Sequence, residues 1–184
     1  MDIDKAPPDS YREGLFFCTE LMESIIIRAG TKADLPRVLE LINELAAYER
    51  AAQEVTNTVE QMEMDGFGIQ PLYGMYVAES KKVIVGISVY YYRYSTWKGK
   101  RLYLEDIVVS QSERGKGIGK RLFEQTMKKS LEDNCTGMMW QVLEWNEPGI
   151  HFYEKYGAKL DKEWVNGSLE AGAIRGLLEA NVIT

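Results

Sequence analysis

The feature that most constrains this chain is an apolar strand leading into a glycine-rich turn and then a helix. The run Leu102 to Val109 predicts a strand, glycines follow at 115, 117 and 119, and the helix after them has Leu122, Phe123, Met127 and Leu131 on its predicted inner face. Backbone N–H groups at a helix N-terminus lack intrahelical partners, and glycines let a bulky anion approach them. The turn therefore suits a pyrophosphate, although spacing alone leaves an ordinary strand–helix turn with surface basic residues as an alternative.

The rest of the chain predicts alternating strands and helices. A helix is expected from Asp34 and a shorter one at 147–156, and further strands are expected at 25–28, 73–78, 83–92 and 137–143. The tail from Lys159 can hold two more strands. Three consecutive strands followed by a βαβ unit predict an α/β (α+β) fold with a mixed sheet and helices on both faces. We expect residues 1–21 to form a flexible N-terminal extension and residues 22–184 to form one domain.

The charge and composition of the chain disfavour several classes of binding partner. The net charge is −6, which disfavours nucleic-acid binding and suits a cationic small molecule. The single histidine excludes multi-histidine metal sites, and two cysteines form no disulfide framework, which is typical of a cytoplasmic protein. No apolar run approaches the roughly 20 residues of a membrane helix, so no membrane partner is expected.

Several motifs occur in an order that matches a known family. They are Arg-Gly-Lys-Gly-Ile-Gly at 114–119 after the apolar strand, Glu-Leu-Ala-Ala-Tyr-Glu at 44–49, Asp-Gly-Phe-Gly at 65–68, Leu-Tyr-Leu-Glu-Asp at 102–106 and Glu-Trp-Asn-Glu-Pro at 144–148. From about Met22 to Ala158 the chain resembles the GNAT N-acetyltransferase superfamily, and within it the diamine (spermidine/spermine) N-acetyltransferases. This resemblance implies a GNAT-like, mostly antiparallel central sheet.

The resemblance also implies a set of site residues. Acetyl-CoA would be the co-substrate, without a metal. Its pantetheine arm would pair with the backbone of Ile107, Val108 and Val109, and its pyrophosphate would lie on Arg114, Gly115, Lys116, Gly117, Ile118, Gly119 and Lys120. Further CoA contacts would come from Asn146, Glu147, Pro148 and Gly149, of which Asn146 and Pro148 also suit helix initiation. Tyr48 and Glu49 would line the amine site together with Glu105, and the protein would be a homodimer.

Acetyl transfer to an amine requires that the ammonium group lose a proton and that the leaving thiolate gain one. An ammonium group with a pKa of about 10.4 is neutral in roughly one molecule in 2,500 at pH 7, so deprotonation costs about 4.6 kcal/mol. By resemblance, Glu105 would attract the cation and accept its proton, and Tyr153 would protonate the leaving thiolate. By residue type alone, Glu105 and Asp106 form a polar strand end or belong to a buried ion pair, and Tyr153 is a core aromatic.

The sequence thus predicts an enzyme, an acetyl-CoA-dependent N-acetyltransferase acting by direct transfer on a diamine, a polyamine or a lysine analogue. An amino acid, an aminoglycoside or a protein lysine remains open as the acceptor. A non-catalytic module that senses acetyl-CoA is a further alternative, which the presence of both Glu105 and Tyr153 disfavours.

Overall fold

The computed structural model describes residues 25–179 of the 184-residue chain. These residues form two compact units that divide between Gln141 and Val142, and each unit is described by itself. The predicted extension, residues 1–21, lies outside the described residues. Its flexibility and the single-domain organisation stay predictions.

The first unit is built on a five-stranded sheet in the order β1-β2-β3-β4-β5. The strands are β1 (Ile25–Ala29), β2 (Gly74–Ser80), β3 (Val83–Ser95), β4 (Gly99–Val109) and β5 (Met138–Met139). Neighbouring strands are antiparallel except β4 and β5, which are parallel. The predicted mixed, mostly antiparallel sheet is therefore confirmed, although β5 is much shorter than the predicted strand at 137–143.

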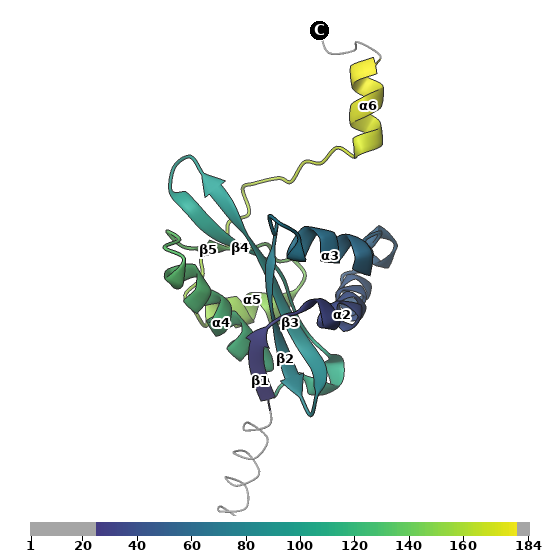
Figure 1. Ribbon diagram of the computed structural model, residues 1–184. Coiled ribbons are helices and arrows are strands. Elements are labelled where there is room, and N and C mark those ends of the chain that lie inside the picture. Colours follow the sequence, from purple (N-terminus) through teal and green to yellow (C-terminus); the bar gives the residue numbers. More distant parts are fainter. Residues whose placement is uncertain (1–24, 180–184) are drawn as a thin grey trace, which may run out of the picture. The chain divides into compact units, whose positions relative to one another are not determined.

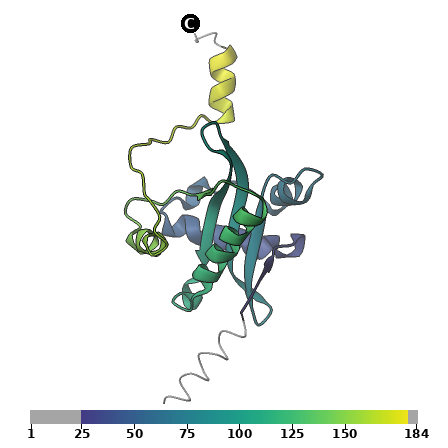
Figure 2. The same cartoon turned by 90° about the vertical axis from the view of Figure 1, so that its left-hand side faces the viewer.

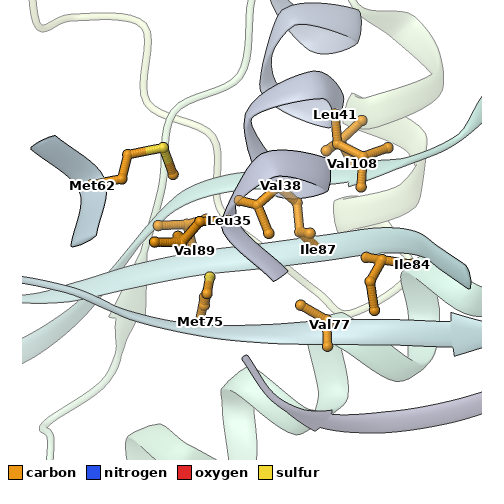
Figure 3. Close-up of a cluster of buried hydrophobic side chains, with 10 residues drawn as sticks. All are labelled: Leu35, Val38, Leu41, Met62, Met75, Val77, Ile84, Ile87, Val89 and Val108. Atoms are coloured by element: carbon orange, nitrogen blue, oxygen red, sulfur yellow. The ribbon is translucent and has the colours of Figure 1, made fainter. Parts of the chain in front are cut away.

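Helices cover both faces of this sheet (Figure 1). One face packs against α2 (Leu35–Tyr48), through a core that includes Leu35, Val38 and Leu41 (Figure 3). The other face packs against α4 (Ile118–Glu132), whose Ile118 and Leu122 are buried in a second cluster. In Figure 2, α4 lies in front of the strands and α2 behind them. Alternate residues of β4 reach the two cores, because successive strand side chains point to opposite faces.

The inner face of α4 differs from the prediction. Leu122 and Phe123 are buried, but Met127 is 37% exposed and Leu131 is 75% exposed. Thr126 and Ser130 are buried in their place. Thr126 is satisfied there because its hydroxyl lies 3.0 Å from the Ser88 hydroxyl and donates to the Leu122 carbonyl, so a buried polar group keeps its hydrogen bonds.

A partly buried ion pair fixes the start of the sheet against the turn that precedes α2. Arg28 on β1 contacts the Asp34 carboxylate at 2.7 Å and Glu79 on β2 at 2.9 Å. The same Asp34 carboxylate accepts from the Thr31 backbone N–H at 2.8 Å. The hydrogen bonds from Arg28 lower the pKa of Asp34 to about 2. Asp34 thus stabilises the folded state as a carboxylate.

Shorter helices complete the two units. In the first unit, α3 (Val59–Phe67) begins after Thr58, whose side chain accepts from the Gln61 N–H. The second unit contains α5 (Glu147–Glu154) and α6 (Ala171–Glu179). The two strands expected in the tail are wrong: within residues 159–179 the structure has the helix α6 and no strand. Five of the nine residues of α6 are Ala, Leu or Glu, which are strong helix formers, and this favours a helix there.

Candidate active site

A β-bulge interrupts β4 at its acidic dipeptide. Val89 on β3 is opposite Asp106 and Tyr90 is opposite Leu104, so Glu105 is the extra residue on β4. A bulge bends its strand and redirects the side chains beside it. It therefore sets two adjacent carboxylates, Glu105 and Asp106, at a bend in β4.

Two further carboxylates, Glu105 and Glu49, act electrostatically on Asp106 at this bend. Burial first, and then the charges of Glu105 and Glu49, raise the pKa of Asp106 to about 6. Partial loss of hydration also raises the pKa of Glu105 and that of Glu49, which follows the last residue of α2. We call Glu49, Glu105 and Asp106 the carboxylate cluster. The structure thus brings together two predicted amine-site residues and adds Asp106, which belongs to the predicted Glu105-Asp106 strand end but was not assigned a role.

Two tyrosine rings lie beside the carboxylate cluster. Tyr91 on β3 and Tyr103 on β4 are opposite each other in the ladder, with ring centroids 5.1 Å apart. Burial and the charge of Glu105 raise the pKa of both phenols. The sequence reasoning missed these tyrosines, because only the strand register shows that they meet. Carboxylates next to aromatic faces form an environment that attracts ammonium groups.

The C-terminal half of β4 has an edge beyond its ladder with β5. That ladder pairs Leu102 and Tyr103 with β5, whereas β4 runs on to Val109. The Ser110 N–H donates to the Val85 carbonyl at 2.8 Å, toward β3. Because backbone groups alternate along a strand, Ile107 and Val109 direct theirs to the opposite edge. Val108, the third predicted residue, buries its side chain in the core on the α2 face.

The glycine turn presents its backbone to open space. Gly115 and Gly117 have φ values of 79° and 76°, which favour glycine, and Gly117 is the N-cap of α4. A β-carbon at either position would meet no atom within 4 Å. Ile118, by contrast, is buried and anchors the helix start. The buried Ile118 therefore anchors the turn to the core, while the open side of the turn can receive a bulky anion, as pyrophosphate binding requires.

The basic residues of the turn have partners within the chain. Lys116 contacts Glu113 at 2.9 Å and Lys120 lies 3.8 Å from Glu124. The Arg114 Nε–H donates to the Val109 carbonyl at 3.0 Å, and the guanidinium carbon lies 5.4 Å from the centre of the Tyr48 ring. Arg114 thus connects two regions that were predicted separately, the phosphate turn and the amine site.

The remaining predicted residues lie in the second unit. Tyr153 on α5 is buried, with its ring edge-on to Phe152 at 5.2 Å. The Asn146 side chain caps α5 by accepting from the Gly149 N–H at 3.1 Å, and Glu147 and Pro148 form the first turn. The predicted helix-initiating role of Asn146 and Pro148 is confirmed. That Tyr153 and Glu105 serve one active site stays a prediction, because the two residues belong to different units.

Within residues 25–179 there is neither a metal-type cluster nor a membrane-spanning helix. No group of three or more His, Cys, Asp or Glu side chains there is arranged to hold a metal ion. No helix in the same part of the chain is long and apolar enough to cross a membrane.

Known proteins resemble this chain in sequence and in fold. Residues 35–158 match the model of the acetyltransferase (GNAT) family. A thialysine N-epsilon-acetyltransferase from Bos taurus is 36% identical over 146 residues, which cover 75% of this chain and 86% of that protein. The human spermidine/spermine N(1)-acetyltransferase-like protein 1 is 36% identical over 74% of this chain and 21% of its own length. An integron cassette protein from V. cholerae shares the fold, with a TM-score of 0.68 and 22% identity over 85% of this chain and 98% of that one.

Proposed function

The chain belongs to the acetyltransferase (GNAT) family, and from this premise we propose that it transfers acetyl from acetyl-CoA to a primary amine of a small polycationic substrate. A lysine analogue, a diamine or a polyamine fits this description. The names of the relatives support the choice, since one acts on thialysine and another is similar to spermidine/spermine acetyltransferases. The observation that carries the proposal is the carboxylate cluster at the bulge of β4.

The carboxylate cluster suits an acceptor with more than one positive charge. The charges of Glu105 and Glu49 add to burial in raising the pKa of Asp106, so the cluster is destabilised when all three carboxylates are ionised. A bound cation relieves that repulsion, and a second cationic group on the same molecule relieves it further. A monoamine would leave part of the repulsion in place. The cluster therefore selects substrates by the number of positive charges that they carry.

The same cluster can accept the proton that the ammonium must lose. Glu105 is the exposed member of the bulge, and its raised pKa makes it a stronger base than an ordinary carboxylate. We assign it the role of general base, directly or through one water. Tyr153 is assigned the role of general acid toward the leaving thiolate, since a phenol can donate a proton to that group.

The CoA moiety fits the outer edge of β4 and the glycine turn. Ile107 and Val109 offer backbone donors and acceptors that can pair with the pantetheine amides like an added strand. One of these N–H groups would polarise the thioester carbonyl. Gly115 and Gly117 leave room for the pyrophosphate, with Lys116 and Lys120 nearby for its charge. Acetyl-CoA supplies the activated acetyl group, and we propose that no metal takes part.

A panel assay tests this function. Purified protein and acetyl-CoA are incubated with thialysine, spermidine, an amino acid, an aminoglycoside and a lysine peptide, while free thiol release is followed. We expect the fastest release with thialysine or spermidine. Preference for one of the other acceptors would support the alternative substrate class, and CoA binding without thiol release would support a sensor.

The role of Tyr153 is tested separately. Tyr153→Phe should lower turnover by about 10²-fold or more with little change in CoA affinity, because it removes only the proton donor. The neighbouring ring variant Phe152→Leu is the control for packing and should retain far more activity. Unchanged turnover in Tyr153→Phe would remove this residue from the mechanism.

Two further properties follow from the resemblance. We propose a homodimer, which sedimentation velocity tests; a purely monomeric profile at assay concentration would contradict it. We also propose a cytoplasmic location, which the low cysteine content supports.

A further inference from the structure

Arg114 occupies positions that both proposed ligands require. Its Nε–H group donates to the Val109 carbonyl at 3.0 Å, on the edge of β4 where a pantetheine amide would pair. Its guanidinium lies over the Tyr48 ring at 5.4 Å. Tyr48 is 37% exposed and directly precedes Glu49 of the carboxylate cluster. One side chain therefore contacts both the backbone carbonyl of Val109, on the edge proposed to bind CoA, and the Tyr48 ring of the proposed amine site.

The guanidinium stands where a substrate cation is expected. An aromatic face beside a carboxylate attracts a cation of either source, so Arg114 and the ammonium group of an amine would compete for Tyr48. The competition ends only if Arg114 moves. Arg114 also begins the turn Gly115 to Lys120, so the phosphates of CoA would attract its charge away from Tyr48.

From these contacts we infer that Arg114 is a positioning residue that couples the two ligands: CoA binding displaces it from Val109 and Tyr48, and thereby opens the amine site. The inference rests on the proposed function, because it needs CoA on the edge of β4. Cofactor and amine then bind with positive coupling, and the coupling is reciprocal, so each ligand tightens the other by the same factor.

A double-mutant cycle on CoA affinity tests the coupling. CoA, which cannot react, is titrated calorimetrically into the wild type, Tyr48→Leu, Arg114→Gln and the double variant. Tyr48→Leu removes a contact that CoA must break, so it should tighten CoA binding about two- to five-fold, the range of an exposed cation–π contact. In the Arg114→Gln background the same substitution should have no effect. Tyr48→Phe keeps the aromatic face and should bind CoA like the wild type.

Tyr94→Leu is the matched control, because Tyr94 is an exposed tyrosine on β3 at 75% exposure. It should leave CoA affinity unchanged. An equal effect of Tyr48→Leu in both backgrounds, or weaker CoA binding in the single variant, would overturn the inference while the proposed function stands. Failure of the wild type to bind CoA would overturn the proposed function and the inference together.

The amine side gives a second readout that a purely structural residue would not move. The dissociation constant of 1,5-diaminopentane is measured with and without saturating CoA. We expect CoA to tighten diamine binding in the wild type by the factor found for the reciprocal effect, and to leave it unchanged in Arg114→Gln. Equal coupling in both proteins would contradict the role of Arg114.

Discussion

Asp106→Asn should make the protein more stable at neutral and alkaline pH. Folding raises the pKa of this carboxyl from an ordinary 3.8 to about 6, through burial and the charges of Glu105 and Glu49. At about 1.4 kcal/mol per pKa unit, ionised Asp106 destabilises the folded state by at most about 3 kcal/mol. Asparagine keeps the size and polarity of the side chain without the charge.

The sign of the pH dependence follows from proton linkage. Between pH 3.8 and about 6 the folded state holds more protons at Asp106 than the unfolded state does. The contribution of this group to the free energy of unfolding is therefore complete below pH 3.8 and is lost as the pH rises through about 6. The gain from Asp106→Asn should be largest at pH 8 and nearly absent at pH 4.

Urea denaturation at these two pH values measures the effect. We expect Asp106→Asn to raise the free energy of unfolding by about 1–3 kcal/mol at pH 8, or the melting temperature by roughly 2–12 °C for a chain of this size. Asp161→Asn, at an exposed aspartate, is the control and should change little. Equal or lower stability of Asp106→Asn at pH 8 would contradict this prediction, since it would mean that the folded protein does not disfavour this charge.

Three other perturbations test the structure. Diamine affinity should rise with pH as Asp106 ionises. Glu49→Gln removes one of the charges that raise the pKa of Asp106, so this rise should shift to lower pH; an unshifted pH profile would show that Glu49 does not act on Asp106. Asp34→Asn should lower the free energy of unfolding by about 2 kcal/mol at pH 7 and have little effect near pH 2, because the pKa of Asp34 is depressed to about 2; an equal loss at both pH values would contradict this origin. Gly117→Val should weaken CoA binding at least ten-fold, since φ is 76° there, whereas Gly167→Val should not; intact CoA binding in Gly117→Val would contradict the placement of the phosphates.

Local patterns in the sequence are sufficient to predict the longer strands of the sheet and the glycine turn. The apolar run Leu102 to Val109 predicts a strand because its residue types favour one, and β4 covers it. The glycines at 115 and 117 predict a sharp turn before a helix, and both have positive φ values. These features depend on neighbouring residues only, which is why the sequence reveals them.

Features that depend on distant residues were not predictable. Met127 and Leu131 continue an apolar spacing along α4, but the sheet meets the helix at Thr126 and Ser130 instead. The hydrogen bond between Thr126 and Ser88 makes that polar face acceptable, and only the register between helix and strand shows it.

The carboxylate cluster also depends on residues that are far apart in the sequence. Glu49 and Asp106 come close because α2 ends beside the bulge of β4, and a bulge leaves no clear sequence signal apart from the acidic pair itself. Resemblance to the family pointed to Glu49 and Glu105, while Asp106 and the two tyrosines emerged from the register of β3 and β4.

The central claim is that the carboxylate cluster selects a polycationic amine for acetylation. The most direct measurement compares kcat/KM for 1,5-diaminopentane and for pentylamine, with acetyl-CoA saturating, in the wild type and in Asp106→Asn. We expect the wild type to prefer the diamine at least ten-fold and Asp106→Asn to lose most of this preference. Equal kcat/KM values for the two amines in the wild type, or a preference untouched by Asp106→Asn, would contradict it.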